Sequence, residues 1–157
     1  MPRDQRIVNI TLDEQTVVRR SPDIEHERKV AIFDLLEENF FAPTGEVSGP
    51  FHLRLGIEEG RLVFDIQSEG GEPVGKIGLA LSSFRRVVKE YFEICGNYFQ
   101  AIKTASPSRI EAIDMGRRGV HNDGSQLLME RLAGKIEIDM PTARRLSTLI
   151  CVLHIRT

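Results

Sequence analysis

The amino-acid sequence predicts an α+β fold in which a small antiparallel sheet packs against one long amphipathic helix. Between residues 51 and 81, apolar and polar residues alternate in three successive segments, as they do in half-buried strands. From Phe84 to Ile102, apolar residues instead recur at helical spacing, and charged residues occupy the opposite face. A sheet with one apolar face needs a helix to cover it, and this helix follows the third strand directly.

The chain before these segments is expected to form a strand, a turn and a helix. Residues 6–12 are rich in β-branched side chains, which predicts a strand. After a turn at residues 19–22, Asp23 can cap a helix that reaches about Asn39. The expected apolar half of this helix consists of Ile24, Ile32, Phe33, Leu35, Leu36 and Phe40. Residues 42–50 are rich in glycine and proline and predict a loop.

The three alternating segments predict a meander with one apolar face. Its strands are expected at Phe51–Ile57, Leu62–Ile66 and Ile77–Leu81. One or two further short strands would complete the small sheet. The long helix within residues 83–105 carries a broad apolar stripe, so we expect the core to form around it.

The C-terminal part is expected to add three helices and a short strand. One helix begins at Ser106–Pro107, since proline is favoured at the first helical position, and ends at Gly116. Residues 125–133 predict the next helix and residues 135–139 a strand. The last helix begins at Pro141 and is apolar nearly all round, which is typical of burial in the core or in a subunit interface. Central burial is favoured, and a homodimer is the alternative.

Length and composition favour a single domain in the cytoplasm. The whole chain, residues 1–157, would form it from an N-terminal strand and turn (1–22), a helix (23–41), the meander (51–81) and a helical part (83–157). No apolar run is long enough for a membrane span, and the N-terminus lacks a signal peptide. A net charge of −2 argues against general nucleic-acid binding, which needs excess positive charge. Cys95 and Cys151 lie on apolar helix faces and are expected to be reduced core thiols.

Residues 116–125 contain the candidate site, because three glycines, two arginines and a histidine lie there between two predicted helices. Glycines let a ligand approach the backbone closely. The free N–H groups at the start of the following helix, those of Gly124 and Ser125 included, would attract an anion. Arg117 and Arg118 could hold the oxygens of that anion in a bidentate fork. The pattern therefore predicts a small loop that binds a phosphate or a carboxylate.

Three interpretations of the function stay open. The first is a non-enzymatic binding or regulatory module, without a cofactor, that accepts a phosphate-bearing small molecule at this loop. The second is an enzyme acting on a phosphorylated small molecule or nucleotide, with Arg117 and Arg118 holding the phosphate. His121 would then act as acid or base, oriented by Asp114 or Glu25. The third is a structural subunit of a protein complex, which predicts a large exposed apolar patch and no pocket.

No recognised motif decides between an enzyme and a binding protein. The loop matches neither the phosphate loop nor the dinucleotide fingerprint, so a plain helix–helix connection is its simplest alternative. No His or Cys spacing predicts a metal site. A Ser–His–Asp set from Ser125, His121 and Asp114 lacks a Gly-x-Ser-x-Gly motif.

Two further sets of charged residues are candidates for binding. Glu25, His26 and Arg28 lie in the first turns of the predicted helix at 23–41, which we expect to extend past the core into solvent. Adjacent arginines also recur as Arg19–Arg20, Arg85–Arg86, Arg117–Arg118 and Arg144–Arg145. Convergence of two such pairs would predict a phosphate-bearing partner. Because acidic residues are interspersed throughout, we expect the pairs to lie on separate faces.

Three segments of the chain resemble a known family. They are Pro22–Arg28, Arg61–Ile66 and Ile110–Gly119. The family is number zero-two-six-two in the UPF series of uncharacterised proteins, found in alphaproteobacteria, and the resemblance covers essentially the whole chain. It implies a bacterial, cytosolic, single-domain protein. It implies no activity and no catalytic residues, so the anion-loop hypothesis depends on the residues alone.

Overall fold

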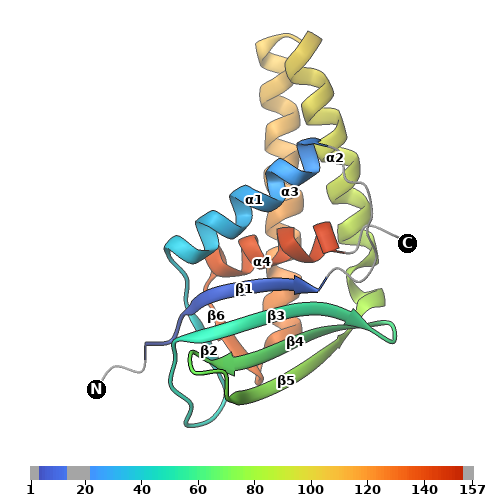
Figure 1. The fold of residues 1–157 in the computed structure, drawn as a ribbon. Coiled ribbons are helices and arrows are strands. Elements are labelled where there is room, and N and C mark those ends of the chain that lie inside the picture. The colour runs from blue at the N-terminus through green and yellow to red at the C-terminus, as the bar shows by residue number, and fades with distance from the viewer. Residues whose placement is uncertain (1–3, 14–21, 154–157) are drawn as a thin grey trace.

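The computed structural model describes residues 4–13 and 22–153 (Figure 1). Its elements follow one another as β1 (Ile7–Asp13), α1 (Pro22–Glu37), β2 (Phe41–Pro43), β3 (Phe51–Glu58), β4 (Arg61–Ser68), β5 (Pro73–Ala80), the 3₁₀ helix η1 (Leu81–Phe84), α2 (Arg85–Thr104), α3 (Pro107–Leu132), β6 (Ile136–Ile138) and α4 (Met140–Leu153). This arrangement confirms the predicted α+β class. Apart from Pro22, the turn predicted at residues 19–22 lies outside the described residues.

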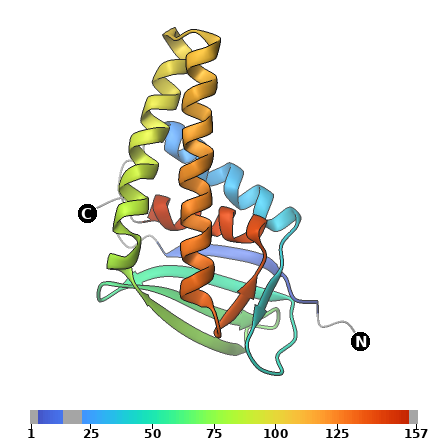
Figure 2. The same ribbon diagram turned by 180° about the vertical axis from the view of Figure 1, so that it is seen from behind.

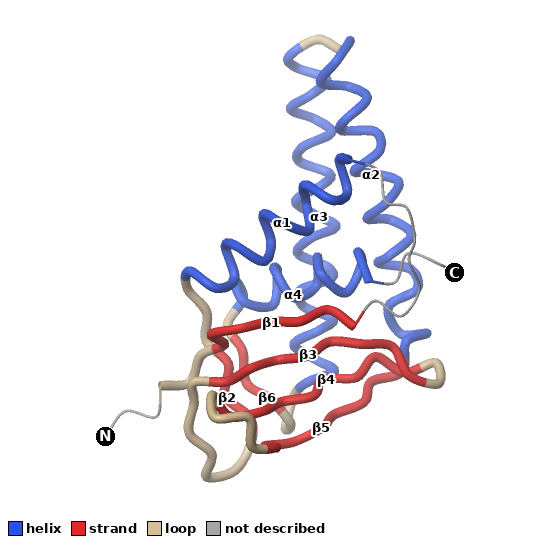
Figure 3. Tube along the Cα trace, in the orientation of Figure 1, coloured by secondary structure: helices blue, strands red, loops and turns tan. Residues whose placement is uncertain are grey.

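The main sheet contains the predicted meander and one additional strand. Its order is β1-β3-β4-β5, and the pairs β3–β4 and β4–β5 are antiparallel (Figure 3). The sheet is not antiparallel throughout, because β1 pairs with β3 in parallel, from Ile7 opposite Phe51 to Asp13 opposite Gly56. Parallel neighbours require a long crossover connection, and α1 lies within the connection between these two strands.

A second, two-stranded sheet pairs β2 with β6 in antiparallel register, Phe41 opposite Ile138. The loop predicted for residues 42–50 is therefore wrong at Ala42 and Pro43, which belong to β2. Their partner strand lies far away in the sequence, so the local composition, rich in glycine and proline, was a poor guide to this pairing.

The helices cover one face of the main sheet (Figures 1 and 2). α1 and α4 lie across the sheet next to β1, and α2 and α3 form an upright antiparallel hairpin whose closed end projects away from the sheet. α4 contacts α1, α2, α3 and β3, and nearly every residue from Thr142 to Val152 is buried. Central burial, which was favoured for the last helix, is what the fold shows. The homodimer stays a prediction.

The loop predicted at residues 116–125 does not exist, because α3 runs without a break through it. The helix begins as predicted, with Pro107 in its first turn and the Ser106 side chain accepting a hydrogen bond from the Arg109 N–H. Two of its three glycines, Gly116 and Gly124, serve helix packing instead of a turn. A Cβ atom on Gly116 would lie 3.3 Å from Ile94 Cδ1 of α2, and one on Gly124 would lie 3.0 Å from Val87 Cγ1 of α2.

Gly124→Ala is expected to destabilise the protein by about 1–3 kcal/mol, the usual cost of overpacking. The added methyl group would overlap Ser147 Oγ of α4 as well as Val87 of α2. Gly119 of the same helix is the matched control, because a Cβ atom there meets nothing within 4 Å. Gly119→Ala is expected to raise stability by about 0.5–1 kcal/mol through helix propensity. Urea denaturation measures the free energy of unfolding of both variants. Equal changes in the two variants would contradict the packing role of Gly124.

The buried face of α1 agrees only in part with the predicted one. Leu35 is buried, and Ile24, Ile32 and Leu36 pack partly buried against the core. The buried residues of α1 are Glu27, Ala31 and Leu35, whereas Phe33, expected on the apolar half, is 63% exposed. The helix packs on α4 and β1. Its first turns do not all extend into solvent as expected, since Glu27 meets a charged partner on α3.

Candidate functional site

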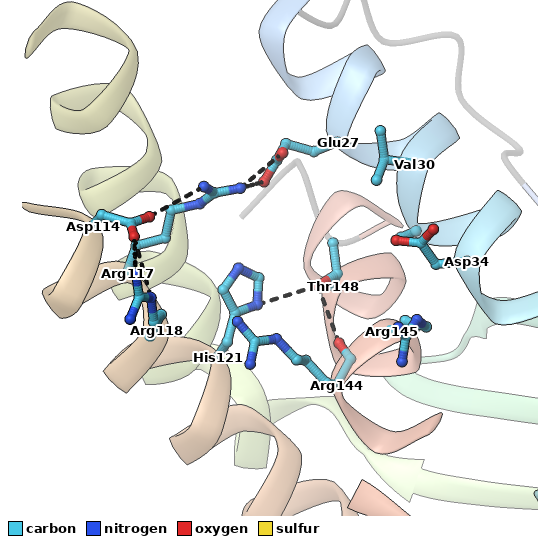
Figure 4. Close-up of a pocket in the computed structure, with 11 residues that line it drawn as sticks. Glu27, Val30, Asp34, Asp114, Arg117, Arg118, His121, Arg144, Arg145 and Thr148 are labelled. Carbon is cyan, nitrogen blue, oxygen red and sulfur yellow. Dashed lines mark hydrogen bonds and ion pairs between the residues drawn. The ribbon is translucent and has the colours of Figure 1, made fainter. Parts of the chain in front are cut away.

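A cavity of about 220 Å³ lies between α1, α3 and α4 (Figure 4). Four arginines line it: Arg117 and Arg118 from α3, and Arg144 and Arg145 from α4. We refer to this cavity as the arginine pocket. Two of the four arginine pairs in the sequence therefore converge, contrary to the expectation that the pairs lie on separate faces. The helices α3 and α4 bring them together because they pack side by side.

The buried carboxylate of Glu27 holds Arg117 at one side of the pocket. Arg117 Nη2 donates hydrogen bonds to Glu27 Oε1 at 2.9 Å and to Oε2 at 3.0 Å. The hydroxyl of the buried Tyr91 donates to Oε1 at 3.4 Å. Burial alone would lower the pKa of the Arg117 guanidinium, but Glu27, through its charge and hydrogen bonds, and the neighbouring Cys95 and Tyr98 together raise it above its usual value. The ion pair therefore joins α1 to α3.

Asp114 lies on α3 one turn before Arg117 and Arg118, and its carboxylate binds Arg118. Arg118 Nη2 and Nε donate to Asp114 Oδ2 at 2.6 and 3.1 Å. Asp114 Oδ1 also lies 3.7 Å from Arg117 Nη1, and the Arg117 guanidinium stacks over the Tyr98 ring at 4.7 Å from its centroid. Both α3 arginines of the pocket, Arg117 and Arg118, are thus held by carboxylates of the protein itself.

The two arginines of α4 have no such carboxylate partner among the described residues. Arg145 Nη1 donates to the carbonyl oxygen of Pro141 at 2.9 Å, and Arg144 lies close enough to His121 to affect its titration. Among the described residues, two buried side-chain donors lack any hydrogen-bond partner, Arg117 Nε and Arg145 Nε. Both belong to arginines that line the pocket. A buried N–H group without a partner costs about 1–3 kcal/mol, so its presence needs a reason.

His121 lies in the pocket wall as a neutral imidazole. Burial lowers the pKa of His121 to about 4, and the nearby charges of Arg144 and Arg117 lower it too. Its Nδ1 lies 3.3 Å from Thr148 Oγ1, and its ring meets Tyr91 edge to face at 5.7 Å between centroids. No hydrogen bond joins His121 to a carboxylate of the described chain, so the expected orientation by Asp114 or Glu25 is not found.

Sequence reasoning identified part of this site. Asp114, Arg117, Arg118 and His121 do line the pocket. Gly124 and Ser125 do not: both are buried inside α3, and Ser125 Oγ donates to the His121 carbonyl oxygen at 2.7 Å. Their N–H groups lie in the middle of the helix, so the anion-binding helix start assumed for them is absent.

The secondary candidates on α1 also fall outside the pocket. Arg28 pairs with Glu25 at 3.4 Å, and His26 is exposed. The polar lining residues that sequence reasoning missed are Glu27, Asp34, Arg144, Arg145 and Thr148. One signal could have found Glu27, since it shares a helical stripe with Ala31 and Leu35 at a spacing of four residues.

Comparison with known proteins places the chain in a family. The model of an uncharacterised protein family, UPF0262, matches residues 4–156. The chain belongs to UPF0262. It is 61% identical over 151 residues to a UPF0262 protein of Rhodopseudomonas palustris strain HaA2, covering 96% of this chain and 93% of the relative. It is 56% identical over 156 residues to one from Paramagnetospirillum magneticum, covering 99% of each chain. These relatives are alphaproteobacterial, and no solved structure matches.

Three further features of the UPF0262 chain concern metal sites, membrane spans and cysteines. Among the described residues, no group of three or more His, Cys, Asp or Glu side chains is placed to hold a metal ion. Within that part of the chain no helix is long and apolar enough to cross a membrane. Cys95 and Cys151 are buried free thiols, as expected, and burial raises the pKa of Cys95 to about 11.

Proposed function

We propose that this protein is a cytoplasmic, non-enzymatic module that binds a small phosphate- or carboxylate-bearing molecule in the arginine pocket. The observation that carries this proposal is that the two unpaired buried donors, Arg117 Nε and Arg145 Nε, both belong to arginines of the pocket. An acceptor oxygen of a bound anion would give such a donor its missing hydrogen bond.

The charges around the pocket support an anion. Four guanidinium groups and three carboxylates, those of Glu27, Asp34 and Asp114, line it, which leaves one positive charge in excess. Glu27 is already paired with Arg117, and Asp114 with Arg118. The uncompensated positive charge therefore lies with Arg144 and Arg145, whose planar guanidinium groups match the oxygens of phosphates and carboxylates. These residues replace Gly124 and Ser125 in the proposed site.

The size of the pocket limits the ligand. At about 220 Å³ the cavity is smaller than the roughly 300–1,000 Å³ typical of pockets for drug-sized ligands. It suits an anionic group that carries a few further atoms. Val30 and Ala31 of α1 supply the apolar part of its lining.

The enzyme alternative has less support. An imidazole with a pKa near 4 is uncharged at pH 7 and is a weak base, whereas effective acid–base catalysts titrate near the working pH. His121 also contacts Thr148 where a catalytic arrangement would place a carboxylate. The structural-subunit alternative predicts no pocket at all, which the arginine pocket argues against.

Thermal-shift measurements against phosphate, pyrophosphate, acetate and small organic phosphates test the proposal. At about a hundred times its dissociation constant, a ligand adds roughly 2.7 kcal/mol of stability, which should raise the melting temperature by about 5–10 °C. The doubly substituted variant Arg144→Ala/Arg145→Ala is expected to lose about 80% or more of this shift. Its shift is measured against its own melting temperature without ligand. Arg85→Ala/Arg86→Ala, which removes an exposed arginine pair outside the pocket, is the matched control.

Two results would contradict anion binding in the pocket. One is the absence of a shift with any anion, including phosphate. The other is an equal loss of the shift in both double variants, because a general dependence on surface charge would then explain it.

A further inference from the structure

Asp34 places a carboxylate in the arginine pocket that has no partner among the described residues. It lies on α1, one turn after Val30 and Ala31, and it lines the cavity with them. No hydrogen bond or ion pair joins its carboxylate to another described residue, although four guanidinium groups line the same cavity. Figure 4 shows Asp34 on the side of the cavity opposite Arg117, Arg118 and His121.

His121 offers a second acceptor in the same pocket. Thr148 Oγ1 donates its only proton to the Arg144 carbonyl oxygen at 3.1 Å. When Thr148 Oγ1 donates to that carbonyl oxygen, its contact with His121 at 3.3 Å is a hydrogen bond accepted from Nδ1–H, and this tautomer leaves Nε2 with a free lone pair. The pocket thus combines arginine donors with two acceptors, Asp34 and His121 Nε2.

A simple inorganic anion would leave these acceptors without partners. Phosphate presents mainly acceptor oxygens, which the Asp34 carboxylate and the lone pair of His121 Nε2 repel. A cavity of about 220 Å³ leaves room for further atoms beside an anionic group. An ammonium group among those atoms would donate hydrogen bonds to Asp34 while the anionic group meets the arginines of α4.

We propose that the natural ligand is a small zwitterion, a molecule of amino-acid size that carries both an ammonium group and a phosphate or carboxylate group. The anionic group faces Arg144 and Arg145, and the ammonium group faces Asp34. This inference rests on the proposed anion-binding function and specifies the ligand class for the same pocket.

Isothermal titration calorimetry with matched probe pairs tests the inference. Phosphoethanolamine and ethyl phosphate differ by one ammonium group, and β-alanine and propionate form the corresponding carboxylate pair. In at least one pair, the zwitterion is expected to bind about tenfold or more tightly than its partner, the effect of one hydrogen bond between charged groups. Asp34→Asn, which keeps the side-chain shape, is expected to abolish this preference. Glu37→Gln, on the exposed face of α1 outside the pocket, is expected to keep it.

The results separate this inference from the function on which it rests. Equal binding within both pairs, or a preference that survives in Asp34→Asn, would overturn the zwitterion and leave anion binding intact. Binding of inorganic phosphate without binding of either zwitterion would do the same. If neither phosphate nor any of the four probes binds, the anion-binding function fails as well.

Discussion

Glu27→Ala is expected to lower the free energy of unfolding by about 3 kcal/mol, because it leaves the charge of Arg117 partly buried without its main partner. Both hydrogen bonds from Arg117 Nη2 would be lost, and the buried Tyr91 hydroxyl would lose its acceptor. Asp114 at 3.7 Å compensates only in part. Thermal unfolding should show a melting temperature lower by about 6–12 °C.

Two comparisons isolate the role of the buried pair. Glu90→Ala removes a carboxylate from the exposed pair with Arg86, and is expected to cost no more than about 0.5 kcal/mol. The double variant Glu27→Ala/Arg117→Ala is expected to be less destabilised than the sum of the single variants, because no unpaired charge then remains. A cost of Glu27→Ala no larger than that of Glu90→Ala would show that the pair does not hold α1 against α3.

Acidification is expected to destabilise the protein through His121, by up to about 3 kcal/mol between pH 6.5 and pH 4. Burial lowers the pKa of His121 from its usual 6.5 to about 4 in the folded protein. Within this window the unfolded chain binds a proton that the folded protein excludes, so protons favour unfolding. The stability that the neutral His121 contributes is fully present above pH 6.5, declines as the pH falls, and is lost below pH 4.

Urea denaturation at half-unit steps of pH measures this effect. His121→Asn retains an amide that can bond Thr148 but has no proton to gain, so its stability should fall less steeply over the same range. Both proteins contain the same carboxylates. Subtracting the free energy of unfolding of the variant from that of the wild type at each pH therefore cancels the contribution of these carboxylates. His26→Gln, which removes an exposed imidazole, controls for the loss of one histidine. Parallel curves for wild type and His121→Asn would show that His121 is not kept neutral by burial.

The arginine pocket contains two kinds of arginine. One kind stabilises the fold, and the other is available to bind a ligand. Arg117 is bound by Glu27 and Asp114 and stacks on Tyr98. Arg144 and Arg145 have no carboxylate partner in the described chain. Substitutions at Arg117 should therefore act mainly on stability, whereas those at Arg144 and Arg145 should act mainly on binding.

The candidate site was predictable from the sequence only where its residues are neighbours along the chain. Arg117, Arg118, His121 and Asp114 attract attention together because they lie on one segment, and the structure places all four in the pocket. The α4 arginines were recognised as a pair but not as part of the site. Their position depends on how α4 packs between α1 and α3, which local spacing does not encode.

The glycines of α3 show why the predicted loop was wrong. A glycine in a sequence indicates either a backbone turn or a close approach of another chain segment, and composition alone does not separate the two. Gly116 and Gly124 belong to the second kind, since α2 and α4 pack where their side chains would be. Only the positions of α2 and α4 in the fold show which kind of glycine each one is.

The sequence by itself determined the α+β class, the meander, the long helix of residues 85–104 and the membership of an uncharacterised bacterial family. Periodicity determines these elements because it reports which side of each segment is buried, and that is a local property. Only the tertiary structure decided that α3 is continuous, that Glu27 turns inward and that two arginine pairs share one pocket. Each of these depends on contacts between residues distant in sequence, where helix packing sets which charges meet.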